Sequence, residues 1–124
     1  MQTHSFIEKW SKKKTIILPV VVGEELELRL YTGPQDLAIG AYGIAEPTGK
    51  VFTDYKELLK LDLDCVYVCT PNRSHSYITV DALHAGKNVM CEKPMAINPA
   101  EAQKMIDAAK RTGKKLTIGY QNGY

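Results

Sequence analysis

The chain of 124 residues lacks the features that most directly mark a membrane or nucleic-acid partner. It has no apolar run close to the roughly 20 residues needed to cross a bilayer, and residues 1–14 lack the apolar core of a signal peptide. Its 16 basic and 14 acidic side chains leave a net charge of +2, and the only basic run, residues 12–14, is short enough to be a solvated turn. We therefore expect a cytoplasmic protein with no membrane or nucleic-acid partner.

Cysteine is also scarce, and the three cysteines that are present follow no metal-binding spacing. Cys65, Cys69 and Cys91 form no C-x-x-C or Cys/His pattern, and their odd number argues against a disulfide framework. We interpret them as small buried hydrophobic side chains in the strands of a reduced protein. His4 and His84 are isolated, which favours surface positions for both, and we predict no metal site.

From about residue 51 onward, short apolar runs alternate with helical patterns. Three runs have the composition of strands, at residues 64–69, 88–91 and 115–119, and helical segments follow the first two of them. The first run is apolar at consecutive positions, which predicts a strand covered on both faces. Strands and helices that alternate with short links predict parallel strands joined by right-handed crossovers.

The clearest helical pattern begins at Asn98. This residue suits the N-cap, Pro99 suits the first helical position, and Glu101 completes a capping-box pattern. Gly113 is a typical C-terminal stop. Apolar residues at the spacing i, i+3, i+4 and i+7 predict one buried face, formed by Ala102, Met105, Ile106 and Ala109.

The first fifty residues give less consistent signals. Residues 15–22 and 26–31 have strand character and are joined around Gly23, but Pro19 argues against a central position in a sheet. Residues 35–42 form at best a short helix. Local preference and hydrophobic pattern agree poorly here, so we expect residues 1–50 to form a divergent part of the chain.

Polar residues follow the first predicted strand of the second half. Thr70, Pro71 and Asn72 come directly after it, and His75 lies at the start of the next helix. In open α/β sheets, ligands bind at the carboxyl ends of the strands, and the positive end of a helix helps to hold a phosphate. The same residues also suit an ordinary turn followed by a helix N-cap, and the sequence leaves both interpretations open.

The second and third strands also end in polar residues. Glu92 and Lys93 follow the second strand, where a lysine beside a substrate hydroxyl can polarise it or move a proton. A surface ion pair is the alternative interpretation of the same two residues. Gln121 and Asn122 follow the third strand, where they either bond a ribose or substrate or simply end the strand.

Four segments, taken together, resemble the N-terminal Rossmann domain of the Gfo/Idh/MocA family of NAD(P)-dependent oxidoreductases. They are residues 51–59 (VFTDYKELL), 66–72 (VYVCTPN) with His75, 85–96 (AGKNVMCEKPMA) and 118–122 (IGYQN). The resemblance implies an α/β, three-layer Rossmann-like domain with a mainly parallel sheet, incomplete in its N-terminal part. Residues 51–124 would be the NAD(P)-binding part, and residues 1–50 a partial Rossmann half or irregular.

The resemblance also implies roles for individual residues. Thr70, Pro71, Asn72 and His75 would line the cofactor cleft near the pyrophosphate and ribose of NAD or NADP. Glu92 would approach the nicotinamide ribose, and Gln121 and Asn122 would complete the nicotinamide side. Lys93 would be the catalytic residue, beside the nicotinamide and a sugar or polyol substrate.

Two departures from the family pattern shape the functional expectation. The glycine-rich G-x-G-x-x-G turn is missing, and residues 40–43 have the wrong spacing for it. Family members also continue into a second, substrate-binding domain, which we expect to be absent here. We therefore expect the nucleotide-binding part of a sugar or polyol dehydrogenase, inactive by itself. The alternative is a non-catalytic domain that forms a homo-oligomer or binds another partner through exposed sheet edges. A third interpretation is a regulator that binds a nucleotide without catalysis.

Overall fold

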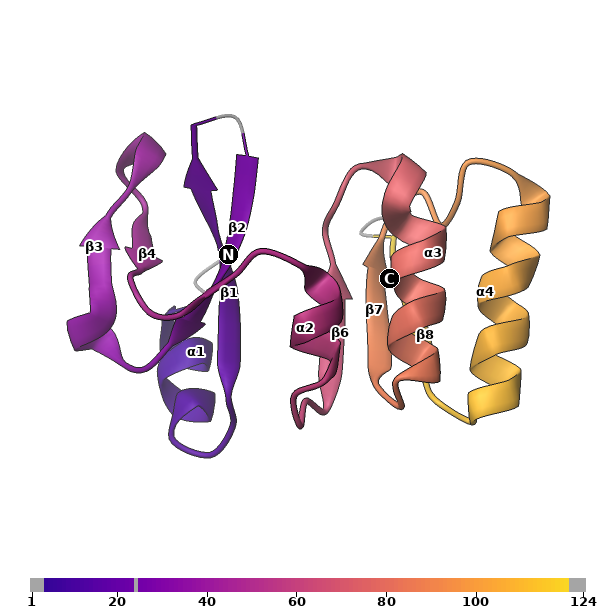
Figure 1. Ribbon diagram of the computed structural model, residues 1–124, viewed down its shortest axis with the longest axis horizontal. Coiled ribbons are helices and arrows are strands. Elements are labelled where there is room, and N and C mark those ends of the chain that lie inside the picture. Colours follow the sequence, from indigo (N-terminus) through magenta and orange to yellow (C-terminus); the bar gives the residue numbers. More distant parts are fainter. Residues whose placement is uncertain (1–3, 24, 121–124) are drawn as a thin grey trace. The chain divides into compact units, whose positions relative to one another are not determined.

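The structure is a computed structural model that describes residues 4–23 and 25–120 (Figure 1). The chain divides into two compact units, Met1–Leu58 and Leu59–Tyr124, and each is described by itself. None of the helices in the described ranges combines the length and apolar character that a bilayer span requires.

The first unit is built from short antiparallel strands. Strand β1 (Ile16–Val22) pairs with β2 (Glu25–Tyr31), and the turn between them includes Gly23 at a φ of 62°. Strand β1 lies at an edge of its sheet, where Pro19 removes no bond from a central ladder. Both predicted strands are therefore confirmed. The remaining elements are helix α1 (His4–Ser11), strands β3 (Leu37–Ile39), β4 (Ala45–Pro47) and β5 (Val51–Phe52), and the 3-10 turns η1 (Pro34–Asp36) and η2 (Ala41–Gly43).

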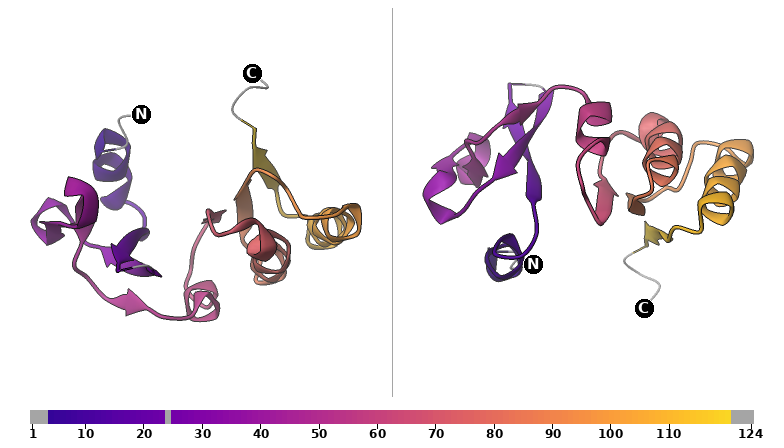
Figure 2. Two further views of the ribbon diagram at one scale, coloured as in Figure 1. Left: turned by 90° about the horizontal axis from the view of Figure 1, so that it is seen from above. Right: turned by 60° about the horizontal axis from the view of Figure 1, so that its bottom comes forward.

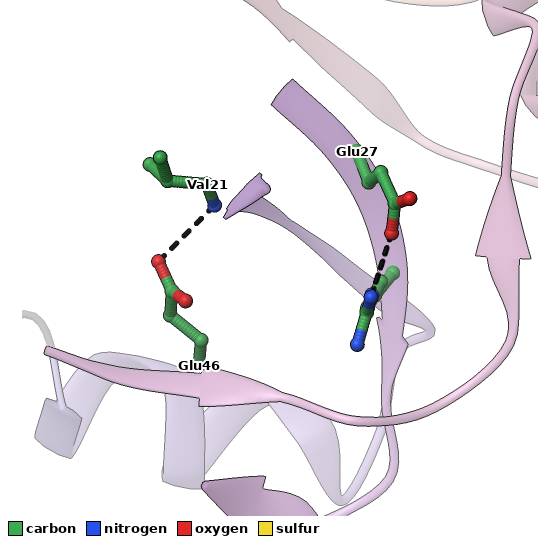
Figure 3. Close-up of polar contacts among 4 residues, drawn as sticks. Val21, Glu27 and Glu46 are labelled. Carbon is green, nitrogen blue, oxygen red and sulfur yellow. Dashed lines mark hydrogen bonds and ion pairs between the residues drawn. The ribbon is translucent and has the colours of Figure 1, made fainter. Parts of the chain in front are cut away.

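A buried carboxylate ties the two sheets of this unit together. Glu46 of β4 is 8% exposed, and its Oε1 accepts a hydrogen bond of 3.2 Å from the Val21 N–H of edge strand β1 (Figure 3). Gly40 leaves room for it, because a Cβ there would stand 1.7 Å from Glu46 Oε2. The ion pair between Glu27 and Arg29, also drawn in Figure 3, is 2.7 Å long and partly exposed. Such surface pairs contribute little stability.

The second unit contains the predicted parallel sheet. Strands β6 (Cys65–Val68), β7 (Asn88–Glu92) and β8 (Leu116–Gly119) are hydrogen-bonded in that order, and both pairings are parallel. Helices α3 (Asn72–His84) and α4 (Pro99–Thr112) connect them and cover the same face of the sheet (Figure 2). Helix α2 (Tyr55–Leu59) lies just before β6 in the chain.

The core of the second unit lies between this sheet and the two helices. Its buried side chains come from alternate strand positions and from the inner faces of α3 and α4; they include Val68, Val89, Cys91, Ile78, Ala82, Leu83, Met105 and Ala108. Two predictions about this region were wrong. The strand at residues 64–69 is covered on one face within the described chain, and Cys65 and Cys69 are exposed rather than buried. Both follow from the same cause, because alternate side chains of β6 point away from the helices.

Helix α4 begins and ends where its sequence predicts. The Asn98 side chain accepts a bond of 2.9 Å from the Glu101 N–H, and Gly113 ends the helix in the left-handed region at a φ of 66°. The predicted buried face is confirmed at Met105 but wrong at Ile106, which is 37% exposed.

The short helix expected at residues 35–42 is wrong. Leu37–Ile39 instead forms β3 and pairs with Ala45–Pro47, and the 3-10 turns η1 and η2 lie on either side of β3 in the chain. The pairing of β3 with β4, the strand that contains Glu46, outweighs the weak local preference of these residues for a helix.

The cap of α4 makes a quantitative prediction. We expect Asn98→Ala to lower the free energy of unfolding by about 1 kcal/mol, because the Glu101 N–H loses its acceptor. Urea unfolding followed by far-UV circular dichroism measures this change. Asn98→Asp keeps an acceptor and serves as the control, so equal losses in the two variants would contradict the cap.

Candidate functional site

The candidate site lies where β6 and β7 end. Because these strands are parallel, their carboxyl ends meet at the same edge of the sheet. Two turns leave that edge: the first turn, residues 69–71, leads into α3, and the second turn, residues 93–98, leads into α4. Thr70, Pro71, Glu92 and Lys93, four of the residues predicted from sequence, therefore lie in or next to these turns.

The first turn is held by hydrogen bonds from a buried serine. Ser74 is buried, and its Oγ lies 2.7 Å from Thr70 Oγ1 and 2.7 Å from the carbonyl oxygen of Pro71. Pro71 is the N-cap of α3 without a side-chain capping bond. Pro71 and Asn72 are exposed, so the side-chain amide of Asn72 faces solvent at the start of the helix, whereas Ser74 and His75 are buried.

His75 lies beneath the two turns rather than on the surface. The residue is 1% exposed. Its Nδ1 is 2.8 Å from the carbonyl oxygen of Pro94, and its Nε2 is 2.7 Å from that of Thr70. One ring thus contacts the backbone of both turns.

Glu92 ends β7, and both of its carboxylate oxygens are engaged. Oε1 accepts a hydrogen bond from the Tyr67 hydroxyl, and Oε2 accepts one of 3.2 Å from the Lys93 N–H. The Tyr67 bond holds the pKa of Glu92 below its usual value, helped by the N–H and the charge of Lys93. The same bond, together with burial, raises the pKa of Tyr67 to about 12.

Tyr67 is the site residue that sequence reasoning missed. It stands opposite Met90 in the β6–β7 pairing, two positions before Glu92. Since side chains alternate along a strand, Tyr67, Met90 and Glu92 share the face of the sheet that α3 and α4 leave open. That alternation was readable from the sequence once the strands had been paired.

The thiols at this edge are poor nucleophiles. Desolvation is the main reason why the pKa of Cys69 is raised, although the residue is exposed overall, and the charge of Glu92 adds to the effect. Burial likewise raises the pKa of Cys91. Because the thiolate is the reactive form, the arrangement does not suit cysteine chemistry.

Lys93 projects from the second turn, and its ammonium group forms no ion pair with the described residues. The residue is exposed, and its peptide bond to Pro94 is cis. Within residues 4–23 and 25–120, no carboxylate lies at ion-pair distance from its Nζ. The surface ion pair considered from the sequence is therefore not formed in the described chain.

Gln121 and Asn122 lie outside the described residues. Strand β8 ends at Gly119, which pairs with Glu92. The described part of the chain holds no group of three or more His, Cys, Asp or Glu side chains placed to bind a metal ion.

The donor set fits one end of a dinucleotide. Asn72, Glu92 and Lys93 offer an amide, a carboxylate and an ammonium group at one edge, which suits ribose hydroxyls and a reacting oxygen. The pyrophosphate requires a glycine turn between a strand and a helix. Residues 40–43 instead include a 3-10 turn between β3 and β4. The described residues therefore offer polar partners for hydroxyl groups at this edge, and residues 40–43 do not form the glycine turn that holds a pyrophosphate.

The Tyr67 bond makes a prediction about pH. We expect Tyr67→Phe to raise the pKa of Glu92 towards its usual value, because the largest cause of its depression is removed. A depressed carboxyl pKa stabilises the fold at higher pH, and the contribution is lost as the pH falls through that pKa. The variant loses part of this dependence. Carbon-13 NMR titration of the Glu92 carboxyl measures the shift, with Tyr77→Phe as the control, and an unchanged titration would contradict the role of Tyr67.

Comparison with known proteins assigns the family. A model described as "Oxidoreductase family, NAD-binding Rossmann fold" (GFO_IDH_MocA) matches residues 35–120. D-glucoside 3-dehydrogenase from Escherichia coli (strain K12) is 45% identical over 67 residues, which are 54% of this chain and 19% of that protein. Inositol 2-dehydrogenase from Salmonella typhimurium (strain LT2) is 33% identical over 97 residues, 77% of this chain and 28% of that protein.

A solved structure agrees with this assignment. The NAD binding oxidoreductase from Klebsiella pneumoniae has a TM-score of 0.57 and 39% sequence identity, covering 59% of this chain and 20% of that one. The chain thus spans less than a third of the length of these relatives. The predicted fold class, oxidoreductase class and cofactor, NAD or NADP, are confirmed at the level of the family. The chain belongs to the Gfo/Idh/MocA family of oxidoreductases, whose NAD-binding Rossmann fold it carries in part.

Proposed function

We propose that this chain carries the nicotinamide end of the cofactor site of an oxidoreductase acting on a sugar or polyol, and that these 124 residues alone are inactive. The meeting of Asn72, Glu92 and Lys93 at one sheet edge supports the proposal most directly. The names of the relatives, a glucoside dehydrogenase and an inositol dehydrogenase, support the substrate class. The bound cofactor supplies or accepts the hydride.

Lys93 is the residue that meets the reacting oxygen in this proposal. When an alcohol is oxidised, its carbon would give a hydride to the oxidised cofactor, and its oxygen would give a proton to solvent water. An ammonium group at hydrogen-bond distance stabilises the negative charge that develops on that oxygen. Lys93 suits this role because its Nζ is exposed and forms no ion pair within the described residues.

Glu92 orients the ribose next to the reacting end. Its carboxylate is fixed by the Tyr67 hydroxyl and the Lys93 N–H, and its depressed pKa keeps it ionised at neutral pH. An ionised carboxylate only accepts hydrogen bonds, and its two oxygens have four lone-pair sites in all. Two of these remain for ribose hydroxyls.

Inactivity of the 124 residues follows from the missing pyrophosphate cradle. The first unit consists mainly of antiparallel strands, and within the described residues it contains no strand, glycine turn and helix of the kind that holds phosphates. Charge-assisted contacts to phosphate are among the strongest polar contacts in proteins. Without them, a dinucleotide is bound by its nicotinamide end alone, too weakly and loosely for hydride transfer.

Titration of NADH and NADPH into the purified chain, followed by nicotinamide emission, tests the proposal. We expect weak saturable binding that Asn72→Ala and Glu92→Gln each weaken about fivefold, the effect of one lost hydrogen bond. Lys104→Ala, an exposed position on α4, is the control and should bind like the parent chain. Inositol or glucoside added with NAD should give no NADH. Absence of binding at millimolar cofactor, or equal binding by all variants, would refute the proposed site.

A second candidate function, self-association, is favoured by the open face of the parallel sheet. Tyr67 and Met90 are 51% and 38% exposed on this face, and Thr117 beside them is exposed. In the described chain, β6 and β8 are edge strands of their sheet. Apolar sheet faces and unpaired edges are common sites of association between chains.

Sedimentation velocity over a range of concentrations tests this second candidate. We expect Met90→Lys to shift the chain towards the monomer, because a charge on the open face is costly to bury. Ile106→Lys places the same charge at 37% exposure on α4, on the covered side of the sheet, and is the matched control. A monomer at every concentration would contradict self-association.

A further inference from the structure

We infer that His75 is a positioning residue that locks the second turn, which carries Lys93, to the first turn. The inference rests on the proposed role of Lys93 and adds a residue that does not itself contact cofactor or substrate. It follows from the burial of the ring and from its two backbone contacts.

The imidazole connects the two turns beyond the ends of β6 and β7. Backbone pairing of β6 with β7 ends at Val68 and Cys91. Beyond these residues, His75 holds the Thr70 carbonyl oxygen at 2.7 Å and the Pro94 carbonyl oxygen at 2.8 Å. Thr70 lies in the first turn and Pro94 directly follows Lys93, so the ring reaches one carbonyl of each turn, and as the imidazolium it donates to both.

Helix α3 supplies a rigid base for this contact. His75 stands in its first turn, and the neighbouring Ser74 is bonded to Thr70 and to the Pro71 carbonyl. The ring is 1% exposed, so water cannot replace it as a donor. A buried carbonyl without a donor is destabilising. The neutral ring donates to one of the two oxygens, and the imidazolium donates to both.

The placement of Lys93 depends on the residues on either side of it. On one side, Glu92 is held by the Tyr67 hydroxyl; on the other, Pro94 is held by His75. The Lys93 side chain is exposed, and the Lys93 N–H donates a hydrogen bond to the Glu92 carboxylate. The direction in which Lys93 leaves the sheet edge is therefore set by these two anchors.

Two substitutions separate the two contacts. An asparagine amide nitrogen takes roughly the place of Nδ1, and a glutamine amide nitrogen that of Nε2. His75→Asn therefore keeps the donor to Pro94, and His75→Gln keeps the donor to Thr70. In nitrogen-15 NMR spectra of the full chain, we expect His75→Gln to shift the amide signals of residues 92, 93, 95 and 96. We expect His75→Asn to shift those of residues 69, 70, 72 and 73 instead.

Ser76→Ala is the control, because Ser76 is buried on the same helix but contacts Glu101 of α4 rather than the turns. NADH affinity is the second readout, and we expect His75→Gln to weaken it about fivefold more than His75→Asn. The same shifts in both histidine variants, or none in either turn, would overturn the inference and leave His75 as a core side chain. If the two histidine variants shift the two turns separately but the chain binds no NADH, the positioning role of His75 would be supported and the proposed function refuted.

Discussion

Parallel pairing of β6 with β7 is the constraint on which the site depends. The pairing sets Tyr67 opposite Met90 and ends at Val68 and Cys91, directly before the two turns. Side chains alternate along a strand, so a slip of one residue in β7 would turn Glu92 towards α3 and Cys91 towards the open face. The core and the site are therefore fixed by one register, and the buried contacts of Val68 and Cys91 hold Tyr67 and Glu92 together.

The second unit could be predicted because its local signals agree with its fold. Asn98 and Gly113 mark the ends of α4 by cap chemistry that operates within a few residues. The first unit differs, because β3 forms only through the pairing of residues 37–39 with residues 45–47. The sequence of residues 35–42 alone does not indicate that pairing. The open face of β6 was missed for a similar reason, because an apolar run does not show whether helices will cover one face of the strand or both.

The position of the candidate residues at one sheet edge was predictable, and their contacts were less so. Strand ends with polar residues identified Thr70, Asn72, Glu92 and Lys93, because parallel strands bring such ends to one edge. The contacts of His75 were not readable, since they need the distance between two turns that only the folded chain sets. From the sequence alone, a histidine at the start of a helix looks the same whether its ring contacts a ligand or two backbone carbonyls.

The contacts around Glu92 explain why, among the described residues, Lys93 forms no ion pair with the neighbouring carboxylate. An adjacent ammonium and carboxylate would ordinarily attract each other, although such exposed pairs are weak. Here the Tyr67 hydroxyl occupies one oxygen of Glu92 and the Lys93 N–H occupies the other. A neutral phenol whose pKa is about 12 holds the carboxylate without cancelling its charge. The edge thus keeps a negative and a positive group apart, which suits a ligand that presents hydroxyl donors to one and an electron-rich oxygen to the other.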